Sequence, residues 1–444
     1  MLASPPLGEL KAKLGSIIDA HAQSLTHFGN DVFAHPEIGF REERTSARIA
    51  EALRRLDLTV EEGLALTGVR ARLRLGKPGP TVCVMGELDG LPVPGHPNAD
   101  PATGVAHACG HNAQLAHLLG VATALVESDA AAHLAGEIVF LAVPAEEYVD
   151  LEWRTDLARR GKVEFLGGKP ELLKDGVFDD IDLAMMVHAS GTPNGNLLST
   201  TWNYNGFVAK QARFIGRAAH AGNAPYRGIN ALNAAVLAMQ AMHMQRETFR
   251  DEDHIRVHPI ITRGGDAINV VPADVRLETF VRGASLEAID EAAEKIDRSL
   301  HAGALALGAA VEIRTLSGYL PLSVNRELGE VFRENAVELV GSARYGESPT
   351  NSASTDAGDL CHVMPVLHPN HGGCSGANHT VDFRIVDPID AYITPAKAMA
   401  HTLVDLLSGD AERAKSVIAG FKPKLTRDEY LAKMRALNRT ERFP

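Results

Sequence analysis

Three runs of uninterrupted apolar residues stand out in the first half of the chain. They cover residues 82–85, 138–144 and 183–187, and each has the length of a short strand. Runs of this kind are typical of strands buried on both faces, as in the parallel sheets of α/β proteins. The pattern therefore predicts a central sheet with helices between its strands.

Polar side chains able to do chemistry follow each predicted strand. Asp89 comes after the first, Glu146 and Glu147 come after the second, and His188 follows the third. In open α/β sheets, sites form beyond the carboxyl ends of the strands. We therefore expect these side chains to gather at one edge of the sheet.

Apolar residues with helical spacing flank the predicted strands. Residues 9–28 and 42–57 carry apolar side chains on one face, and a helix-like run covers residues 113–127. Further helices are expected near residues 325–340, 394–408 and 427–437. These elements place the chain in the α/β class, with a central mixed sheet.

The order of predicted helices and strands changes between residues 205 and 317. The predicted order there is strand, helix, strand, strand, helix, strand, which is the split-βαβ (ferredoxin-like) arrangement. The elements are expected at residues 208–215, 228–246, 255–262, 275–281, 286–307 and 311–316. We therefore expect an inserted domain over 205–317 and a discontinuous domain over 1–204 and 318–444.

Residues 148–182 form a charged, helix-prone excursion between the second and third predicted strands. One possibility is that this segment lines a pocket. A charge-rich run is more commonly a solvated face, so a pair of surface helices is the more economical interpretation.

Composition narrows the classes of function. The net charge is −12, which argues against nucleic acid or an anionic membrane as a partner. No apolar run approaches the ~20 residues of a membrane span, and the N-terminal stretch lacks the features of a signal peptide. The four cysteines are scattered, so we expect reduced thiols in a cytoplasmic protein.

A set of thiol, imidazole and carboxylate side chains suggests a metal site. A Cys-x-His pair, Cys109 and His111, precedes the helix-like run, and such ligands suit Zn²⁺. These residues also have interpretations without a metal. Cys109 could be a buried cysteine beside helix-capping groups, and Glu146 and Glu147 could be a solvated pair on the surface. The other candidates are His188 and His379. Adjacent glutamates could share the work, one binding metal and one acting as a base, provided that the chain turns after Pro144.

Together these motifs resemble the dinuclear metallopeptidases of the aminoacylase and carboxypeptidase family. They are most similar to its amidohydrolase branch, which includes aminobenzoyl-glutamate and indoleacetyl-amino acid hydrolases. The resemblance covers nearly the whole chain. Besides the residues above, it is carried by the segments at 35–40, 86–89, 219–232, 269–272 and 354–356.

The resemblance implies roles for individual residues. The metal ligands would be Cys109, His111, Glu147, His188 and His379, with Cys109 bridging two ions. Glu146 would be the general base, and His220 would stabilise the oxyanion in the site of a neighbouring subunit. Asn269 and Arg282 would bind substrate, Arg282 as a carboxylate clamp. Without the resemblance, Arg282 would be interpreted as an ordinary surface charge.

The sequence departs from the commoner motif of this branch at two positions. Asn112 stands where Asp is commoner, and Gln114 stands where the branch has a further His. These changes alter the hydrogen bonding around the ligands and leave metal preference open. His117 is expected to be a helix-face histidine, and His107 could be either a partner of the ligands or structural.

The implied function is hydrolysis of the amide bond of N-acyl or N-aroyl amino acids with two divalent ions, Zn²⁺ or Mn²⁺, per chain. The inserted domain would act as a lid and would form a homodimer. Alternatives are a dipeptidase or aminoacylase of the same family, or a non-catalytic, metal-stabilised binding protein.

Overall fold

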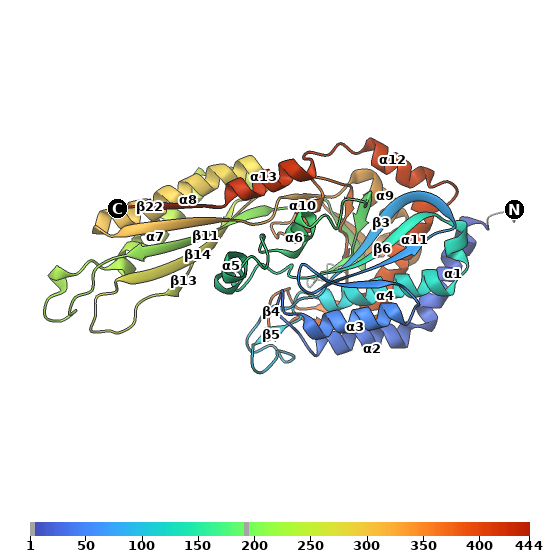
Figure 1. Ribbon diagram of the computed structural model, residues 1–444, viewed down its shortest axis with the longest axis horizontal. Helices are drawn as coiled ribbons and strands as arrows, with labels where there is room; N and C mark the ends of the chain where they lie inside the picture. The colour runs from blue at the N-terminus through green and yellow to red at the C-terminus, as the bar shows by residue number, and fades with distance from the viewer. Residues whose placement is uncertain (1–4, 191–194) are drawn as a thin grey trace. The chain divides into compact units, whose positions relative to one another are not determined.

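The computed structural model describes residues 5–190 and 195–444 and divides the chain into two compact units (Figure 1). Residues 1–4 of the stretch inspected for an export signal lie outside the described residues. The first unit contains Met1–Trp202, Ser323–Pro349 and Leu360–Lys424. The second contains Asn203–Leu322, Thr350–Asp359 and Leu425–Pro444.

The first unit is built on a six-stranded mixed sheet with the order β1-β2-β6-β3-β7-β18. The partners of β3 on both sides, β6 and β7, run parallel to it, and Val84 lies opposite Phe140 and Met185. The bounds are β1 Val60–Leu64, β2 Gly68–Arg74, β3 Lys77–Glu87, β6 Ala135–Val143, β7 Leu183–Met185 and β18 Val366–Leu367. The three apolar runs are therefore central, buried strands, as their composition predicts.

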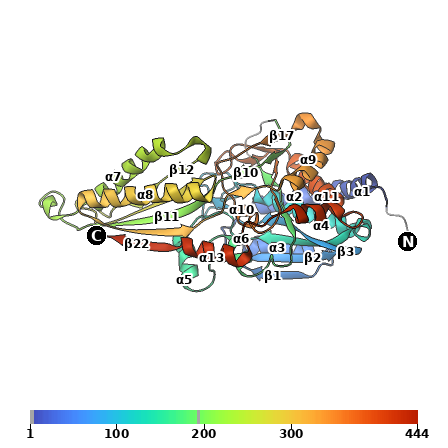
Figure 2. The same cartoon turned by 90° about the horizontal axis from the view of Figure 1, so that it is seen from above.

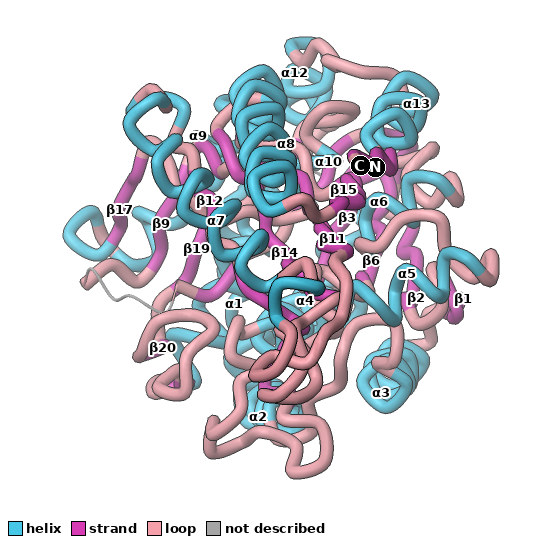
Figure 3. Tube along the Cα trace, turned by 90° about the vertical axis from the view of Figure 1, so that its left-hand side faces the viewer, coloured by secondary structure: helices cyan, strands magenta, loops and turns pink. Residues whose placement is uncertain are grey.

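A second, smaller sheet of this unit has the order β17-β9-β19-β8. Its strands β17, β9 and β19 run side by side (Figure 3). The bounds are β8 His188–Ala189, β9 Leu198–Thr201, β17 Tyr345–Ser348 and β19 Asn370–His371. His188 thus lies on a strand of its own, directly after β7.

Helix α4 (His111–Glu127) is the central helix of the first unit and is buried along most of its length. Its run of Ala, Leu and Gly leaves no polar face, so other helices cover it. The helices of this unit are α1 Leu7–Ala20, α2 Ala22–Phe33, α3 Glu43–Arg54, α5 Leu151–Arg159, α6 Gly168–Lys174, α9 Arg326–Val340, α11 Thr394–Leu407 and α12 Glu412–Gly420.

The predicted helix over residues 9–28 is two helices, α1 and α2. The break is at His21, whose backbone leaves the helical region (φ −93°, ψ 5°). The apolar face ends at Ile18 and resumes at Leu25, so both pieces still bury apolar residues. Amphipathic spacing alone does not reveal this break.

The solvated-helix interpretation of residues 148–182 is wrong for α6. Its residues from Gly168 to Leu173 are buried, and Lys169 is entirely inaccessible to solvent. A run rich in Lys and Glu looks solvated in sequence, but here it carries charges that are paired inside the unit.

The second unit contains the expected split-βαβ arrangement. Its antiparallel sheet has the order β12-β14-β11-β15-β22, with β13 also paired to β14. Helices α7 and α8 pack together on one face of this sheet (Figure 2). The bounds are β11 Gly206–Ile215, α7 Ala231–Met244, β12 Arg256–Val257, β13 Ile260–Arg263, β14 Asp274–Gly283, α8 Leu286–Leu307, β15 Ala310–Ser317, α13 Arg427–Leu437 and β22 Arg439–Phe443.

Two details of this unit differ from expectation. The strand predicted at 255–262 is divided into β12 and β13, because Pro259 has no N–H to donate to the ladder. The C-terminal segment, expected in the discontinuous domain, packs with the second unit. Its strand β22 pairs with β15 along the register Val311 to Phe443, which completes the sheet at that edge.

Candidate metal centre

The candidate site of the first unit begins at the N-terminus of α4. Gly110 has a left-handed backbone (φ 83°), and a Cβ there would lie 2.4 Å from the Cβ of Ala189. Only glycine avoids both the strain and the clash. The tight turn brings the side chains of Cys109 and His111, the first residue of α4, into one site.

Cys109 lies at the centre of the predicted ligands. Its sulfur is 3.4 Å from Nε2 of His188 and 3.3 Å from Nε2 of His379. Nε2 of His379 is in turn 3.1 Å from Oε1 of Glu147. Cys109 therefore belongs to two groups of possible ligands, one with His111 and His188 and one with Glu147 and His379. Cys109 is therefore the one side chain common to these two groups.

A third group of possible ligands consists of Glu87, His111 and Glu146. Nε2 of His111 lies 3.1 Å from Oε2 of Glu87 and 3.8 Å from Oε2 of Glu146. On its other side, Nδ1 of His111 donates to the carbonyl oxygen of Asp89 at 2.8 Å. This hydrogen bond fixes the ring and directs Nε2 at the carboxylates.

The glutamate pair is presented by a turn after β6. Ala145 has a left-handed backbone (φ 52°), so the chain turns directly after Pro144. This is the turn that the two glutamates need if one is to bind metal and the other is to act as a base. The N–H of Ala145 donates to Oε1 of Glu42 at 2.7 Å, and the N–H of Glu147 donates to Oδ2 of Asp89 at 2.9 Å. Both Glu146 and Glu147 are buried. The alternative of a solvated pair is therefore wrong.

The late loop enters the site through the backbone. The N–H of His379 donates to the carbonyl oxygen of Ala108 at 2.8 Å, with His379 itself in the left-handed region (φ 65°). The side-chain amide of Asn378 donates to the carbonyl oxygen of Ala189 at 3.2 Å. The loop is therefore anchored to the segment that carries Cys109.

The ionisable side chains of the site strongly shift one another's pKa values. Burial and the Glu147 carboxylate raise the pKa of Cys109, but the positive imidazoles of His188, His111 and His379 outweigh them and lower it to about 5. The Glu147 carboxylate raises the pKa of His379 to about 11. Burial raises the pKa of Glu147, yet His379 brings it down to about 2. Without a metal, protons on the imidazoles neutralise the thiolate and the carboxylates.

The donor set fits divalent cations. Thiolate, imidazole and carboxylate are the ligands of Zn²⁺, and carboxylate also suits Mn²⁺. Nε2 of His111 and Oε1 of Glu147 are buried and make no hydrogen bond within residues 5–190 and 195–444. Buried polar atoms without hydrogen bonds are costly, and bound ions in the two groups would satisfy them.

The two departures from the commoner motif have specific partners. The amide of Asn112 points away from the ligands and donates to the carbonyl oxygen of Gly29 and to the hydroxyl of Tyr392, both at 3.1 Å. An aspartate could not make the first of these bonds. Gln114 pairs with Glu87, donating to its Oε2 at 2.9 Å and accepting from its backbone N–H at 3.0 Å.

The two further histidines of this segment are buried and neutral. Nε2 of His117 donates to the carbonyl oxygen of Ala391 at 2.7 Å, which agrees with a structural role on a helix face. His107 is fully buried, and burial lowers its pKa to about 3. Neither of its ring nitrogens is hydrogen-bonded to the part of the chain that the structure describes.

The remaining predicted residues, His220, Asn269 and Arg282, belong to the second unit. His220 is exposed, and its Nδ1 accepts from the backbone N–H of Gly222 at 3.1 Å. Asn269 is exposed on the neighbouring segment, where its carbonyl oxygen accepts from the N–H of Ala221 at 2.9 Å.

Arg282 is not a free surface charge. Its Nη1 donates to Oγ of Ser354 at 2.8 Å, and its guanidinium lies 5.3 Å from the ring centres of Phe207 and Phe280. These contacts hold a long side chain in one orientation, which is the preparation that a carboxylate clamp needs.

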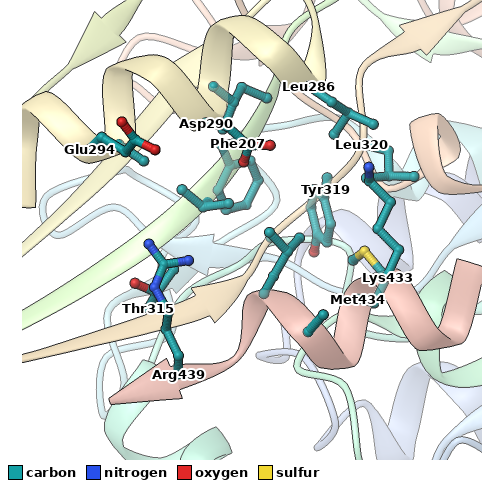
Figure 4. A pocket seen from close by; sticks show the side chains of 16 residues that line it. Phe207, Leu286, Asp290, Glu294, Thr315, Tyr319, Leu320, Lys433, Met434 and Arg439 are labelled. Carbon is teal, nitrogen blue, oxygen red and sulfur yellow. The ribbon is translucent and has the colours of Figure 1, made fainter. Parts of the chain in front are cut away.

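The second unit also contains a pocket of about 340 Å³ beside α8 and α13 (Figure 4). Asp290 and Glu294 line it from α8, and Lys433 and Arg439 line it from α13 and β22. The residues that line this pocket belong to the second unit, whereas the candidate metal ligands all belong to the first.

Sequence reasoning missed several residues of the metal centre. Glu87 and Asp89 were visible as carboxylates at a strand end, but the resemblance assigned them no role. Lys169, which donates to Oε1 of Glu87 at 2.5 Å, had no signal, because it lies in a charged run. Only the fold places that run inside the unit.

Comparison with known proteins agrees with this geometry. The model of Peptidase family M20/M25/M40 matches residues 83–405. The Xaa-Arg dipeptidase of Mus musculus is 28% identical over 95% of this chain and 94% of its own length. The indole-3-acetyl-aspartic acid hydrolase of Enterobacter agglomerans is 27% identical over 71% of this chain and 79% of its own.

A solved structure has the same fold. The aminobenzoyl-glutamate utilization protein from Klebsiella pneumoniae superposes with a TM-score of 0.66 at 21% identity, covering 89% of this chain and 98% of the other. The family match spans most of the chain, including the segments that carry the clustered ligands. The chain therefore belongs to Peptidase family M20/M25/M40 and is a metal-dependent amidohydrolase.

Proposed function

We propose that this enzyme hydrolyses the amide bond between an acyl or aroyl group and an amino acid with a free carboxylate. The observation that carries the proposal is the division of the buried glutamate pair. Oε1 of Glu147 lies among the ligands, 3.1 Å from His379, whereas Oε2 of Glu146 lies 3.8 Å from His111 on the other side. One carboxylate can bind metal while its neighbour handles a proton.

We propose that Cys109, His111, Glu147, His188 and His379 would hold two divalent ions, Zn²⁺ or Mn²⁺, with Cys109 common to two groups of ligands. When bound, such ions supply Lewis acidity that polarises a carbonyl and makes water nucleophilic at neutral pH. Asp89 supports this set by orienting His111 and by accepting from the N–H of Glu147.

Glu146 would then act as the general base and acid. Its carboxylate takes the proton of the attacking water and returns it to the nitrogen of the leaving amino acid. The burial of Glu146 and the position of its Oε2, 3.8 Å from Nε2 of His111, support this role.

The proposal gives the second unit the roles of lid and substrate binder. Arg282 would hold the substrate carboxylate, supported by its fixation against Ser354 and two phenylalanine rings. Asn269 would bind the substrate beside it. His220, exposed and anchored through Nδ1, would donate from Nε2 to the oxyanion in a partner subunit.

We further propose a homodimer formed through the second unit. Its strand β13 lies at the edge of the sheet beyond β14, whereas β22 covers the opposite edge. Ile260 and Ile261 on β13 and Ile268 after it are exposed. Exposed isoleucines beside a strand edge are a common feature of surfaces that pair with another chain. A cytoplasmic location stays a prediction.

A second candidate is hydrolysis of dipeptides, because the relative matched over 95% of this chain is an Xaa-Arg dipeptidase. The two activities differ only in the group on the carbonyl side of the scissile bond, an acyl or aroyl group in one case and an aminoacyl group in the other. They can be separated by paired panels of N-acyl or N-aroyl amino acids and of dipeptides ending in the same amino acids.

The test uses purified protein stripped of metal and reloaded with Zn²⁺ or Mn²⁺. We expect kcat/KM to be highest for an acyl or aroyl amino acid with a free carboxylate and to collapse when that carboxylate is amidated. Higher values across the dipeptide panel would favour the second candidate. Protein with two ions bound that hydrolyses neither panel would contradict both. The metal-free protein and Glu146→Gln serve as inactive controls.

A further inference from the structure

A buried ion pair stands beside the metal centre, outside the set of ligands proposed above. Nζ of Lys169 lies 2.5 Å from Oε1 of Glu87, and both side chains have no exposed surface. Lys169 reaches the site from α6, and Glu87 is the last residue of β3. Two charges are tolerated at such depth only when they neutralise each other and are well hydrogen-bonded.

The second oxygen of Glu87 faces the metal centre. Its Oε2 accepts from Nε2 of Gln114 at 2.9 Å and lies 3.1 Å from Nε2 of His111. The backbone N–H of Glu87 donates to Oε1 of Gln114 at 3.0 Å. Lys169 and Gln114 thus fix the carboxylate from two sides, with one lone pair of Oε2 available toward His111.

The separation between Glu87 and His111 has the size expected of two ligands on one ion. Atoms that each lie about 2.1 Å from an ion are separated by roughly 3.0 Å at a right angle and roughly 3.4 Å at the tetrahedral angle. Glu146 completes this group. Within this group, Glu87 pairs with Lys169 through its other oxygen.

We propose that Glu87 is an additional metal ligand, through Oε2, at the position defined by His111, and that Lys169 is its permanent counter-charge. Glu87 thereby adds a carboxylate to the five ligands proposed above, and Lys169 pairs with that carboxylate when no metal is present. This inference rests on the proposed metal centre and extends it.

The arrangement gives Lys169 two opposite effects. In the metal-free protein it stabilises the fold, because without it Oε1 of the buried Glu87 carboxylate loses its lysine partner. In the loaded protein it competes with the cation for the same carboxylate, so it weakens metal binding. A lysine that only supports packing would have the first effect and not the second.

The test measures thermal unfolding of metal-free protein and the affinity for Zn²⁺ alone, in competition with a chelator, for three variants. Lys169→Met should lower the unfolding midpoint by roughly 5 to 15 °C and tighten Zn²⁺ binding about tenfold. Glu87→Gln should weaken binding at one of the two sites by roughly 10- to 100-fold. The double variant should regain most of the lost midpoint, because the carboxylate charge that Lys169 neutralises is removed as well.

Matched controls come from the same elements. Lys174→Met alters the other lysine of α6, which is partly exposed and paired with Glu171, and should leave Zn²⁺ affinity unchanged. Glu137→Gln alters a carboxylate on β6 that is paired with Arg72 and should do the same.

Unchanged affinity and stoichiometry in Glu87→Gln would overturn the ligand assignment. Additive midpoint losses in the double variant would overturn the counter-charge. Neither measurement uses a substrate, so a failure of the proposed amidase activity would leave both results interpretable. Conversely, an active enzyme with unaltered Zn²⁺ binding in both single variants would refute only this inference.

Discussion

The sulfur of Cys109 lies 3.3 Å from Nε2 of His379, although 270 positions separate the two residues in the chain. The contact joins the N-terminus of α4 to a loop near the end of the first unit. A ligand set assembled from such distant segments depends on the complete fold of that unit, so metal binding and folding should be coupled.

Replacing Cys109 tests this centre directly. Cys109→Ala removes the atom shared by two ligand groups, so we expect loss of activity and of much of the bound metal. Metal content by elemental analysis, beside circular dichroism of the folded protein, provides the measurement. Cys361→Ala, a change at another buried cysteine, is the control and should retain about two ions per chain. Full metal and full activity in Cys109→Ala would refute the site assignment.

Glu146→Gln separates proton transfer from binding. The amide is nearly isosteric with the carboxylate but cannot accept the proton of water, so kcat should fall by roughly 10²- to 10⁴-fold. Metal content and substrate affinity should stay close to those of the unaltered enzyme. Steady-state kinetics measure the fall in kcat, and calorimetry measures the affinity for substrate. A loss of only a few-fold would mean that another group acts as the base.

His220→Ala tests the proposed assembly. If His220 completes a partner's site, kcat should fall by about 10²-fold or more while metal content and folding are unchanged. Mixing this variant with Glu146→Gln should restore activity, since one site of each hybrid dimer then contains both intact residues. Subunit exchange is verified with differently tagged chains. Exchange without recovery would place His220 outside the partner's site.

Glu42 gives a prediction for pH. Burial and the nearby Asp89 carboxylate raise the pKa of Glu42 to about 7, above its ordinary value of 4.5. Between those values the folded state binds a proton that the unfolded state does not. The free energy of unfolding should therefore fall by up to about 1.4 kcal/mol for each unit of rising pH.

Glu42→Gln should remove this slope, because an amide does not titrate. Denaturant unfolding of metal-free protein between pH 5 and pH 7 provides the comparison. Glu37→Gln is a suitable control, since Glu37 accepts from the first turn of α3 rather than from the turn at Ala145. An unchanged slope in Glu42→Gln would assign the pH dependence to another group.

The sequence was most informative where one local signal dominates. Helix α8 has the predicted bounds because Ser285 caps its start and Gly308, in the left-handed region, ends it. The central strands were visible because an uninterrupted apolar run has few alternatives. The proximity of Asp89 and Glu147 followed from strand ends that share one edge of a sheet.

What the sequence concealed depends on tertiary contacts. Whether Lys169 is solvated or buried is decided by the elements around α6, and a charged run gives no sign of them. The outward direction of Asn112 depends on Gly29 and Tyr392, which lie far away in the chain. The attachment of β22 to β15 required a pairing partner more than a hundred positions away.

Gly110 has an evolutionary consequence. Its left-handed backbone and its contact with Ala189 exclude side chains for two independent reasons. Shortening Ala189 to glycine would remove the clash but not the backbone strain, so no single second change can make room for alanine at position 110. A library that randomises positions 109–111 and is selected for activity should therefore return glycine at the middle position. Selection for the site should therefore keep the thiol, the glycine and the imidazole together at consecutive positions.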